Sequence, residues 1–209
     1  MNITAQKNEL IFGYSCGNLG EAKSLFTSMY LYLNSVAAKK ASIFDNILAE
    51  NFNELKGIGL KKLKYTDCMK PAEPKSHNSN QSINPLNRLI GDINTLDWKG
   101  VYKGFKEFSI AVNDNDSVKL IKMDPGTSVP LHSHNGKEYI LVLEGSFCDE
   151  YGEYNKGDIQ INDQQIKHNP TASNSNGCIC LSITENDVVF FGKFGSILNL
   201  FTFIKSFFK

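Results

Sequence analysis

The sequence lacks several features that would assign a protein to a class at once. Its 209 residues carry no net charge, with 22 Lys and Arg against 22 Asp and Glu, so no excess of one charge points to nucleic acid. No apolar run reaches the roughly 18 residues that a membrane span needs. The N-terminus also lacks the basic segment, apolar run and cleavage site of a signal peptide. We therefore expect no direct binding of nucleic acid and no membrane span.

Cysteine and histidine are scarce as well. The five cysteines are odd in number and lack the spacing of a disulfide framework, which together with the missing signal peptide is typical of the reducing cytoplasm. No nucleophile stands beside a base, and no Gly-rich loop could cradle a phosphate. Of the four histidines, His77 lies in a polar stretch, and the other three gather between residues 132 and 168.

Those three histidines predict a metal site. In an extended strand His132 and His134 point to the same side. A three-residue loop, 135–137, would pair His134 with Glu138 and add a carboxylate to the same inner face, and His168 is the obvious fourth ligand. Three imidazoles and one carboxylate suit several divalent ions, including zinc, iron, manganese and nickel. The alternative is that these polar residues lie on a solvated sheet edge.

The rest of the chain divides into a helical part and a strand-rich part. Apolar residues recur at helical spacing over 4–14, 19–34 and 36–55. Short strands bounded by turn residues follow later in the chain and indicate an all-β barrel. We expect these strands over 101–112, 118–123, 139–147, 159–161, 178–184 and 188–191. The fold class is thus α+β, with a helical domain over 1–70, a linker rich in Pro, Ser and Asn over 71–86, and a barrel domain over 87–209.

Two features have two interpretations each. The apolar stripes of the three helices, the third of which includes Ile43 and Ile47, can pack into a core or face a partner. Cys178 and Cys180 share one face of a strand, so they are either small hydrophobic core residues or a redox-sensitive pair. Neighbouring same-face positions are poorly placed for a disulfide, which favours packing.

The spacing of the candidate ligands carries a family resemblance. The stretch PGTSVPLHSHNGKEYILVLEG at residues 125–145, followed by KGDIQINDQQIKHNP at 156–170, resembles the pair of cupin motifs. With the helical stretch ELIFGYSCGNL at residues 9–19, the chain resembles the ChrR-type anti-sigma factors over nearly its whole length. The resemblance implies a helical domain that inhibits an extracytoplasmic-function sigma factor, and a cupin domain that governs its release under oxidative stress. It also implies zinc, bound by His132, His134, Glu138 and His168.

The helical domain departs from the family in one respect. The family carries a second zinc site there, built from a histidine and a Cys-x-x-Cys, but residues 29–36 read MYLYLNSV and supply none of these ligands. We expect apolar packing by Met29, Leu33 and Val36 in its place. Two other functions share the barrel's ligand set, namely a cupin metalloenzyme such as a dioxygenase and a non-catalytic metal-binding module. The helical domain ahead of the barrel favours the regulator, because a stand-alone cupin enzyme needs no such domain.

Overall fold

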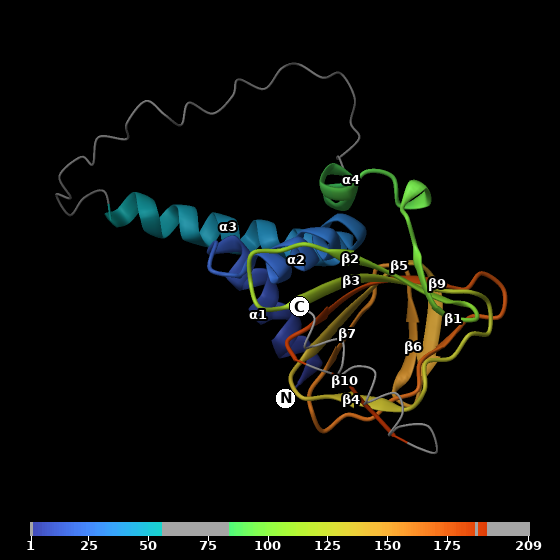
Figure 1. Ribbon diagram of the computed structural model, residues 1–209. Coiled ribbons are helices and arrows are strands. Elements are labelled where there is room, and N and C mark those ends of the chain that lie inside the picture. The colour runs from blue at the N-terminus through green and yellow to red at the C-terminus, as the bar shows by residue number, and fades with distance from the viewer. Residues whose placement is uncertain (1, 56–83, 187, 192–209) are drawn as a thin grey trace.

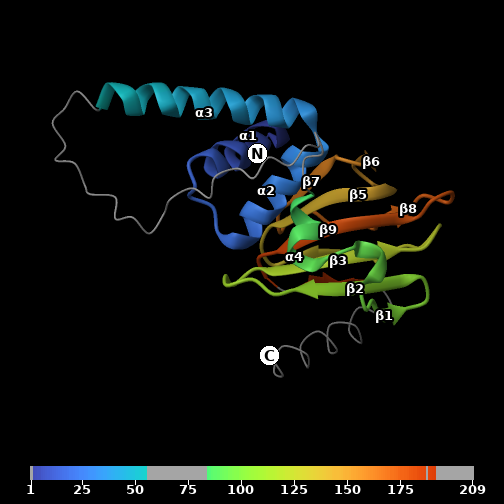
Figure 2. The same ribbon diagram turned by 90° about the horizontal axis from the view of Figure 1, so that it is seen from above.

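In the computed structural model, the described residues are 2–55, 84–186 and 188–191. Helices α1 (Ile3–Ser15), α2 (Glu21–Leu33) and α3 (Ser35–Leu55) follow one another and lie together on one face of a β-domain (Figures 1 and 2). The three expected helices are confirmed. The predictions for residues 71–83, including His77, fall outside the described residues, and the domain boundaries stay predictions.

The β-domain is antiparallel throughout and is preceded by a short helix, α4 (Pro85–Ile90). Its larger sheet has the order β1-β2-β3-β9-β5-β6, with β7 and β8 also paired to β5, and a smaller sheet pairs β10 with β4. The expected strand over 101–112 is two strands, because a turn at Gly104 with φ of 81° divides it. The strands are β1 (Lys99–Tyr102), β2 (Phe105–Ile110), β3 (Ser117–Met123), β4 (His132–His134), β5 (Glu138–Asp149), β6 (Gly152–Asn155), β7 (Ile159–Asn162), β8 (Thr171–Ala172), β9 (Cys178–Thr184) and β10 (Val188–Phe190).

Strand β5 explains why helices and strands form one body. Its first six residues are all buried, so the strand is covered on both faces. Ile140 and Val142 belong to a small cluster inside the barrel. Tyr139 and Leu141 belong to a larger core that includes α1 and α2, and the rings of Phe26 and Tyr139 meet edge to face at 6.0 Å. The helices therefore bury apolar side chains on the outside of the sheet, which gives them the further surface that three short helices need.

The start of α2 is attached to the loop between β2 and β3. The Ala22 amide donates to Asp114 Oδ2 at 2.8 Å, and the Asn113 amide donates to Glu21 Oε2 at 2.7 Å. A Cβ on Gly20 would meet Asp114 Oδ2 at 2.9 Å, so a side chain there would push the carboxylate away. Because a helix begins with unpaired amides, this loop replaces the side-chain cap that α2 lacks.

The apolar packing expected in place of the second zinc site is present only in part. Met29 is 2% exposed, and Leu33 packs against the same core. Val36 is 66% exposed, so its assignment to the core is wrong. The reason is that α3 begins at Ser35 and turns the side chain of its second residue outward.

The stripe of α3 is divided between the two interpretations. Phe44 packs against the core and meets the ring of Phe12 edge to face at 5.4 Å. Ile43 and Ile47 are 57% and 49% exposed. One edge of the stripe therefore holds α3 to its neighbours, and the other edge faces outward.

Candidate metal centre

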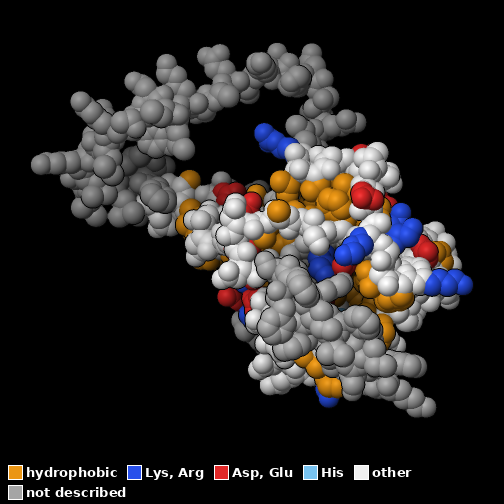
Figure 3. Space-filling model, viewed as in Figure 1, with side chains coloured by type: hydrophobic (Ala, Val, Ile, Leu, Met, Phe, Trp, Pro, Cys, Tyr) orange, Lys and Arg blue, Asp and Glu red, His pale blue; other side chains and the backbone are white. Residues whose placement is uncertain are grey.

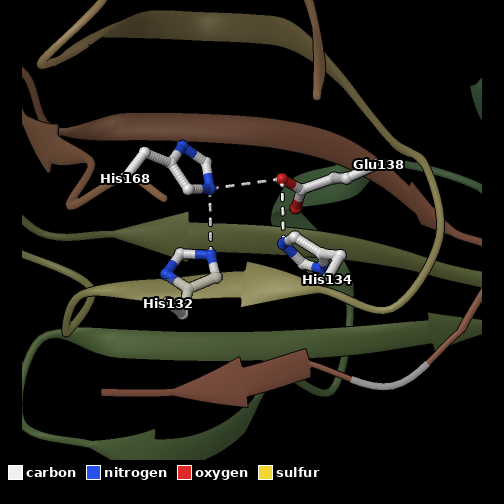
Figure 4. Close-up of side chains that lie close together, drawn as sticks. All are labelled: His132, His134, Glu138 and His168. Carbon is white, nitrogen blue, oxygen red and sulfur yellow. Dashed lines mark hydrogen bonds and ion pairs between the residues drawn. The ribbon is translucent and has the colours of Figure 1, made fainter. Parts of the chain in front are cut away.

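The four expected ligands converge inside the β-domain. His132 and His134 lie on β4, Glu138 opens β5, and His168 lies between β7 and β8 (Figure 4). All four are at most 5% exposed. His132 Nε2 lies 3.0 Å from His168 Nε2. Glu138 Oε2 lies 3.1 Å from His134 Nε2 and 3.4 Å from His168 Nε2.

The route by which they converge differs from the expected hairpin. Strand β4 pairs with β10, where His134 lies opposite Val188, and it does not pair with β5. Glu138 instead lies opposite Thr184 of β9. The predicted pairing of His134 with Glu138 is therefore wrong. The loop 135–137 crosses from one sheet to the other, and the ligands meet across the interior rather than along one ladder.

The imidazoles of His132 and His168 are each oriented by a hydrogen bond at Nδ1. His132 Nδ1 lies 2.8 Å from the Pro130 carbonyl oxygen, which can only accept, so this nitrogen carries the proton. His168 Nδ1 lies 3.1 Å from Asp149 Oδ2, a carboxylate whose side chain is fully buried. In both rings Nε2 is left facing the other ligands. Histidines that bind metals are commonly held in this way.

Glu138 is held by two further polar residues. Asn162 Nδ2 donates to Glu138 Oε2 at 3.2 Å, and Ser182 Oγ donates to Oε1 at 3.5 Å. Sequence reasoning missed both of these residues and Asp149. Asn162 and Ser182 could have been noticed as polar residues within apolar strands, whereas nothing in the local sequence marks Asp149.

The surroundings shift the pKa values of the two neighbouring histidines, His132 and His168, in opposite directions. Burial and the neighbouring His168 lower the pKa of His132 to about 4. Burial acts on His168 in the same direction, but hydrogen bonds to Asp149 and Glu138 outweigh it and raise the pKa of His168 to about 9. Burial would raise the pKa of Glu138, but its contacts with His134 and His168 lower that pKa well below the usual range. Without a metal, the site at neutral pH thus holds an ionised carboxylate and a proton on His168.

Two observations test whether a metal ion fits. His134 is 2% exposed, yet the described residues offer its Nδ1 no hydrogen bond, and its Nε2 faces only the Glu138 carboxylate. The ligand atoms all lie within 4.8 Å of one another. Ligand atoms bound to one ion at about 2.0–2.2 Å are separated by about 3–4 Å. The buried cluster can therefore hold a metal ion, and it is the one group of three or more metal-binding side chains among the described residues.

The two thiols named from the sequence lie inside the barrel. Cys178 Sγ and Cys180 Sγ are 3.3 Å apart, and both residues are at most 2% exposed. The hydrogen bond with Cys178 and burial raise the pKa of the Cys180 thiol well above its ordinary value. The pair packs against Val142 and Phe147. These contacts favour the packing interpretation, and a redox role stays a prediction.

Fold and site together define a class. The antiparallel barrel and the buried cluster of three histidines and one glutamate are the features of a cupin whose interior could hold a metal ion, and a helical layer covers the outer face of this barrel. Residues 86–186 match the family model of the ChrR cupin-like domain.

The resemblance extends beyond the barrel. The chain is 28% identical over 185 residues to the anti-sigma-E factor ChrR of Cereibacter sphaeroides, covering 84% of this chain and 86% of the relative. It also matches a chain in the crystal structure of Rhodobacter sphaeroides SigE in complex with the anti-sigma ChrR. That match has a TM-score of 0.71 and 28% identity, and it covers 85% of this chain and 96% of the other. The chain is thus ChrR-like in its helices as well as in its barrel. No helix among the described residues is long and apolar enough to cross a membrane.

Proposed function

We propose that this protein is an anti-sigma factor. Its N-terminal helices bind an extracytoplasmic-function sigma factor and keep it inactive, and its cupin domain responds to oxidative stress. The observation that supports this most directly is the extent of the match to the chain from the SigE–ChrR complex, which covers 85% of this chain and so includes helices as well as barrel. Because sigma factors act on RNA polymerase, the proposal also places the protein in the cytoplasm.

The metal centre is proposed to bind one divalent ion through His132, His134, Glu138 and His168. Zinc is the first candidate because nitrogen and carboxylate ligands suit it and because the ChrR resemblance implies it. Iron, manganese and nickel accept the same ligands. Zinc has no redox chemistry of its own. The chain's residues would therefore use the ion to hold β4, the start of β5 and the His168 segment together.

The partner surface is proposed to include the outward edge of α3. Ile43 and Ile47 are exposed there, and Phe12 of α1, which contacts Phe44 on α3, is 47% exposed. Fully burying an isoleucine or phenylalanine side chain contributes about 1.5–3 kcal/mol, and these three are about half exposed, so covering each would stabilise a complex with an apolar partner by roughly half that amount. Figure 3 shows hydrophobic side chains coming to the surface in patches between charged ones.

The experiment is co-purification of the full chain with each extracytoplasmic-function sigma factor of the native host. We expect one of them to be retained. Ile47→Asp should release it, because a carboxylate would be buried in an apolar contact. Ala49→Asp is the matched control, since Ala49 is exposed and, at 100° per residue, points to another side of α3. Retention of no sigma factor by a folded chain would refute the proposal, and equal loss by both variants would refute the assigned surface.

A further inference from the structure

Glu185, the residue after β9, holds the loop that joins two of the metal-site residues. The Lys137 amide donates to Glu185 Oε2 at 3.1 Å, and the Glu185 amide donates to the Lys137 carbonyl oxygen at 3.0 Å. A Cβ on Gly136 would meet Glu185 Cβ at 3.1 Å, so the two segments lie close together there. Lys137 stands immediately before Glu138 and three residues after His134. The position of this loop therefore depends on Glu185.

The second oxygen of the same carboxylate reaches the helical layer. Lys23 Nζ on α2 donates to Glu185 Oε1 at 2.8 Å, and the two side chains are 26% and 27% exposed. Lys23 Nζ also lies 5.3 Å from the centre of the Tyr139 ring, and Tyr139 follows Glu138. Among the ion pairs of the described residues, this one joins the helices to the barrel.

The surroundings of this ion pair leave room for movement. A cavity of about 170 Å³ lies between the helices and the barrel, and Lys23, Lys137, Tyr139 and Glu185 are among the residues that line it. Protein interiors are normally close-packed, so a displacement passes directly between packed neighbours. Beside this cavity the loop 135–137 and helix α2 are instead joined through the Glu185 carboxylate, which bonds to both. A displacement of the loop therefore moves the group that holds Lys23.

We propose that Glu185 is a positioning residue that couples the metal centre to helix α2. With metal bound, the loop 135–137 is fixed and the carboxylate keeps Lys23 in place. When metal leaves, the loop loses its fixed end at Glu138, and the attachment of Lys23 weakens. The inference rests on the proposed metal site but not on the identity of any protein partner. Coupling of this kind is reciprocal, so a ligand that moves α2 also changes the affinity for metal.

The test is hydrogen–deuterium exchange of the full chain, loaded with zinc and again after treatment with a chelator. In the wild type we expect removal of zinc to speed amide exchange about fivefold in the first turns of α2. A factor of about five is the largest effect that the loss of one partly exposed ion pair is expected to have. Lys23→Met breaks the contact with α2 but leaves both hydrogen bonds between Glu185 and Lys137. In that variant the zinc response of α2 should fall below about twofold, while the response of the loop 135–137 persists.

Lys119→Met is the matched control, because it makes the same substitution in another ion pair, Lys119 Nζ to Glu107 Oε2 at 2.9 Å, which lies between β2 and β3. It should keep the full response of α2. The proposal is overturned if Lys23→Met keeps that response or if Lys119→Met loses as much of it as Lys23→Met does. It is also overturned if removing zinc does not change amide exchange in α2 of the wild type. Zinc content measured on the same samples separates a missing metal site from missing coupling. Sigma-factor retention is assayed separately, so its failure is not confused with either.

Discussion

Asp149→Asn is the sharpest test of how the metal site is built. The Asp149 side chain is fully buried, and its Oδ2 lies 3.1 Å from His168 Nδ1 and accepts from Gln160 Nε2 at 2.7 Å. Asparagine keeps the shape of the side chain but removes its charge. A carboxylate behind a metal-binding histidine makes the imidazole a stronger ligand, and losing it typically lowers metal affinity about 10- to 100-fold. The same charge also strengthens the hold of His168 on a proton.

These two effects oppose each other and give the substitution a pH dependence. Metal can bind only the deprotonated imidazole, and the pKa of His168 is raised to about 9. At pH 7, two units below that pKa, competition from the proton on His168 weakens zinc binding to the wild type about 100-fold. At pH 9 the same competition weakens zinc binding only about twofold. Asp149→Asn relieves part of this competition at pH 7. We therefore expect the full loss of zinc affinity at pH 9 and a smaller loss at pH 7.

The assay is competition for zinc against a chromophoric chelator at both pH values. Asp158→Asn is the control, because Asp158 Oδ2 accepts from the Asn155 amide in a turn and does not contact the four ligands. It should bind zinc as the wild type does at each pH. Unchanged affinity of Asp149→Asn at pH 9, or a loss at pH 7 as large as the loss at pH 9, would show that Asp149 does not act on the metal through His168.

Three further substitutions or labelling experiments test the fold. Phe26→Ala should lower the free energy of unfolding, measured by denaturant titration, by about 3–5 kcal/mol, because Phe26 is fully buried against Tyr139. A loss below about 1 kcal/mol would mean that the helices are not docked on the sheet. Gly145→Ala should lower the free energy of unfolding by at least about 1–2 kcal/mol, because Gly145 has φ of 67° and an added Cβ would overlap the Gly177 carbonyl. Gly100→Ala is the control and should lower it less, because the space around Gly100 is open. An equal cost in both would contradict the strained turn. A thiol-labelling reagent should modify Cys16 and Cys148, which are exposed, in the folded protein, and it should modify the buried Cys178 and Cys180 only after unfolding. Immediate labelling of the buried pair would favour its redox interpretation over packing.

The candidate ligands could be found from the sequence because their signal is local. His132 and His134 are two residues apart, and in an extended strand this spacing is enough to place both on one side. Local rules predicted the wrong strand pairing around the loop 135–137, because a short loop between two strands usually makes a hairpin. Here the partner of β4 is β10, a strand far along the chain, and no turn rule reports such a pairing.

The error at Val36 has the same origin. Its apolar character suggests a core residue, but only the direction in which α3 leaves α2 decides which side of the helix is covered. The same holds for Ile43 and Phe44, which are neighbours in one stripe and yet differ in burial. Helical periodicity identifies an apolar side of a helix, and tertiary packing decides how much of that side is covered.

The amino-acid sequence by itself determined the helical and strand-rich halves and the positions of His132, His134 and Glu138 through short-range periodicity and spacing, and it determined His168 through the second cupin motif. Only the tertiary structure decided which groups support and connect that centre. Asp149 meets His168 across 19 positions of the chain, and Lys23 meets Glu185 across 162. Contacts over such separations exist only after the barrel closes and the helices dock on it, since burial and strand pairing, rather than the identity of neighbouring residues, bring those side chains together.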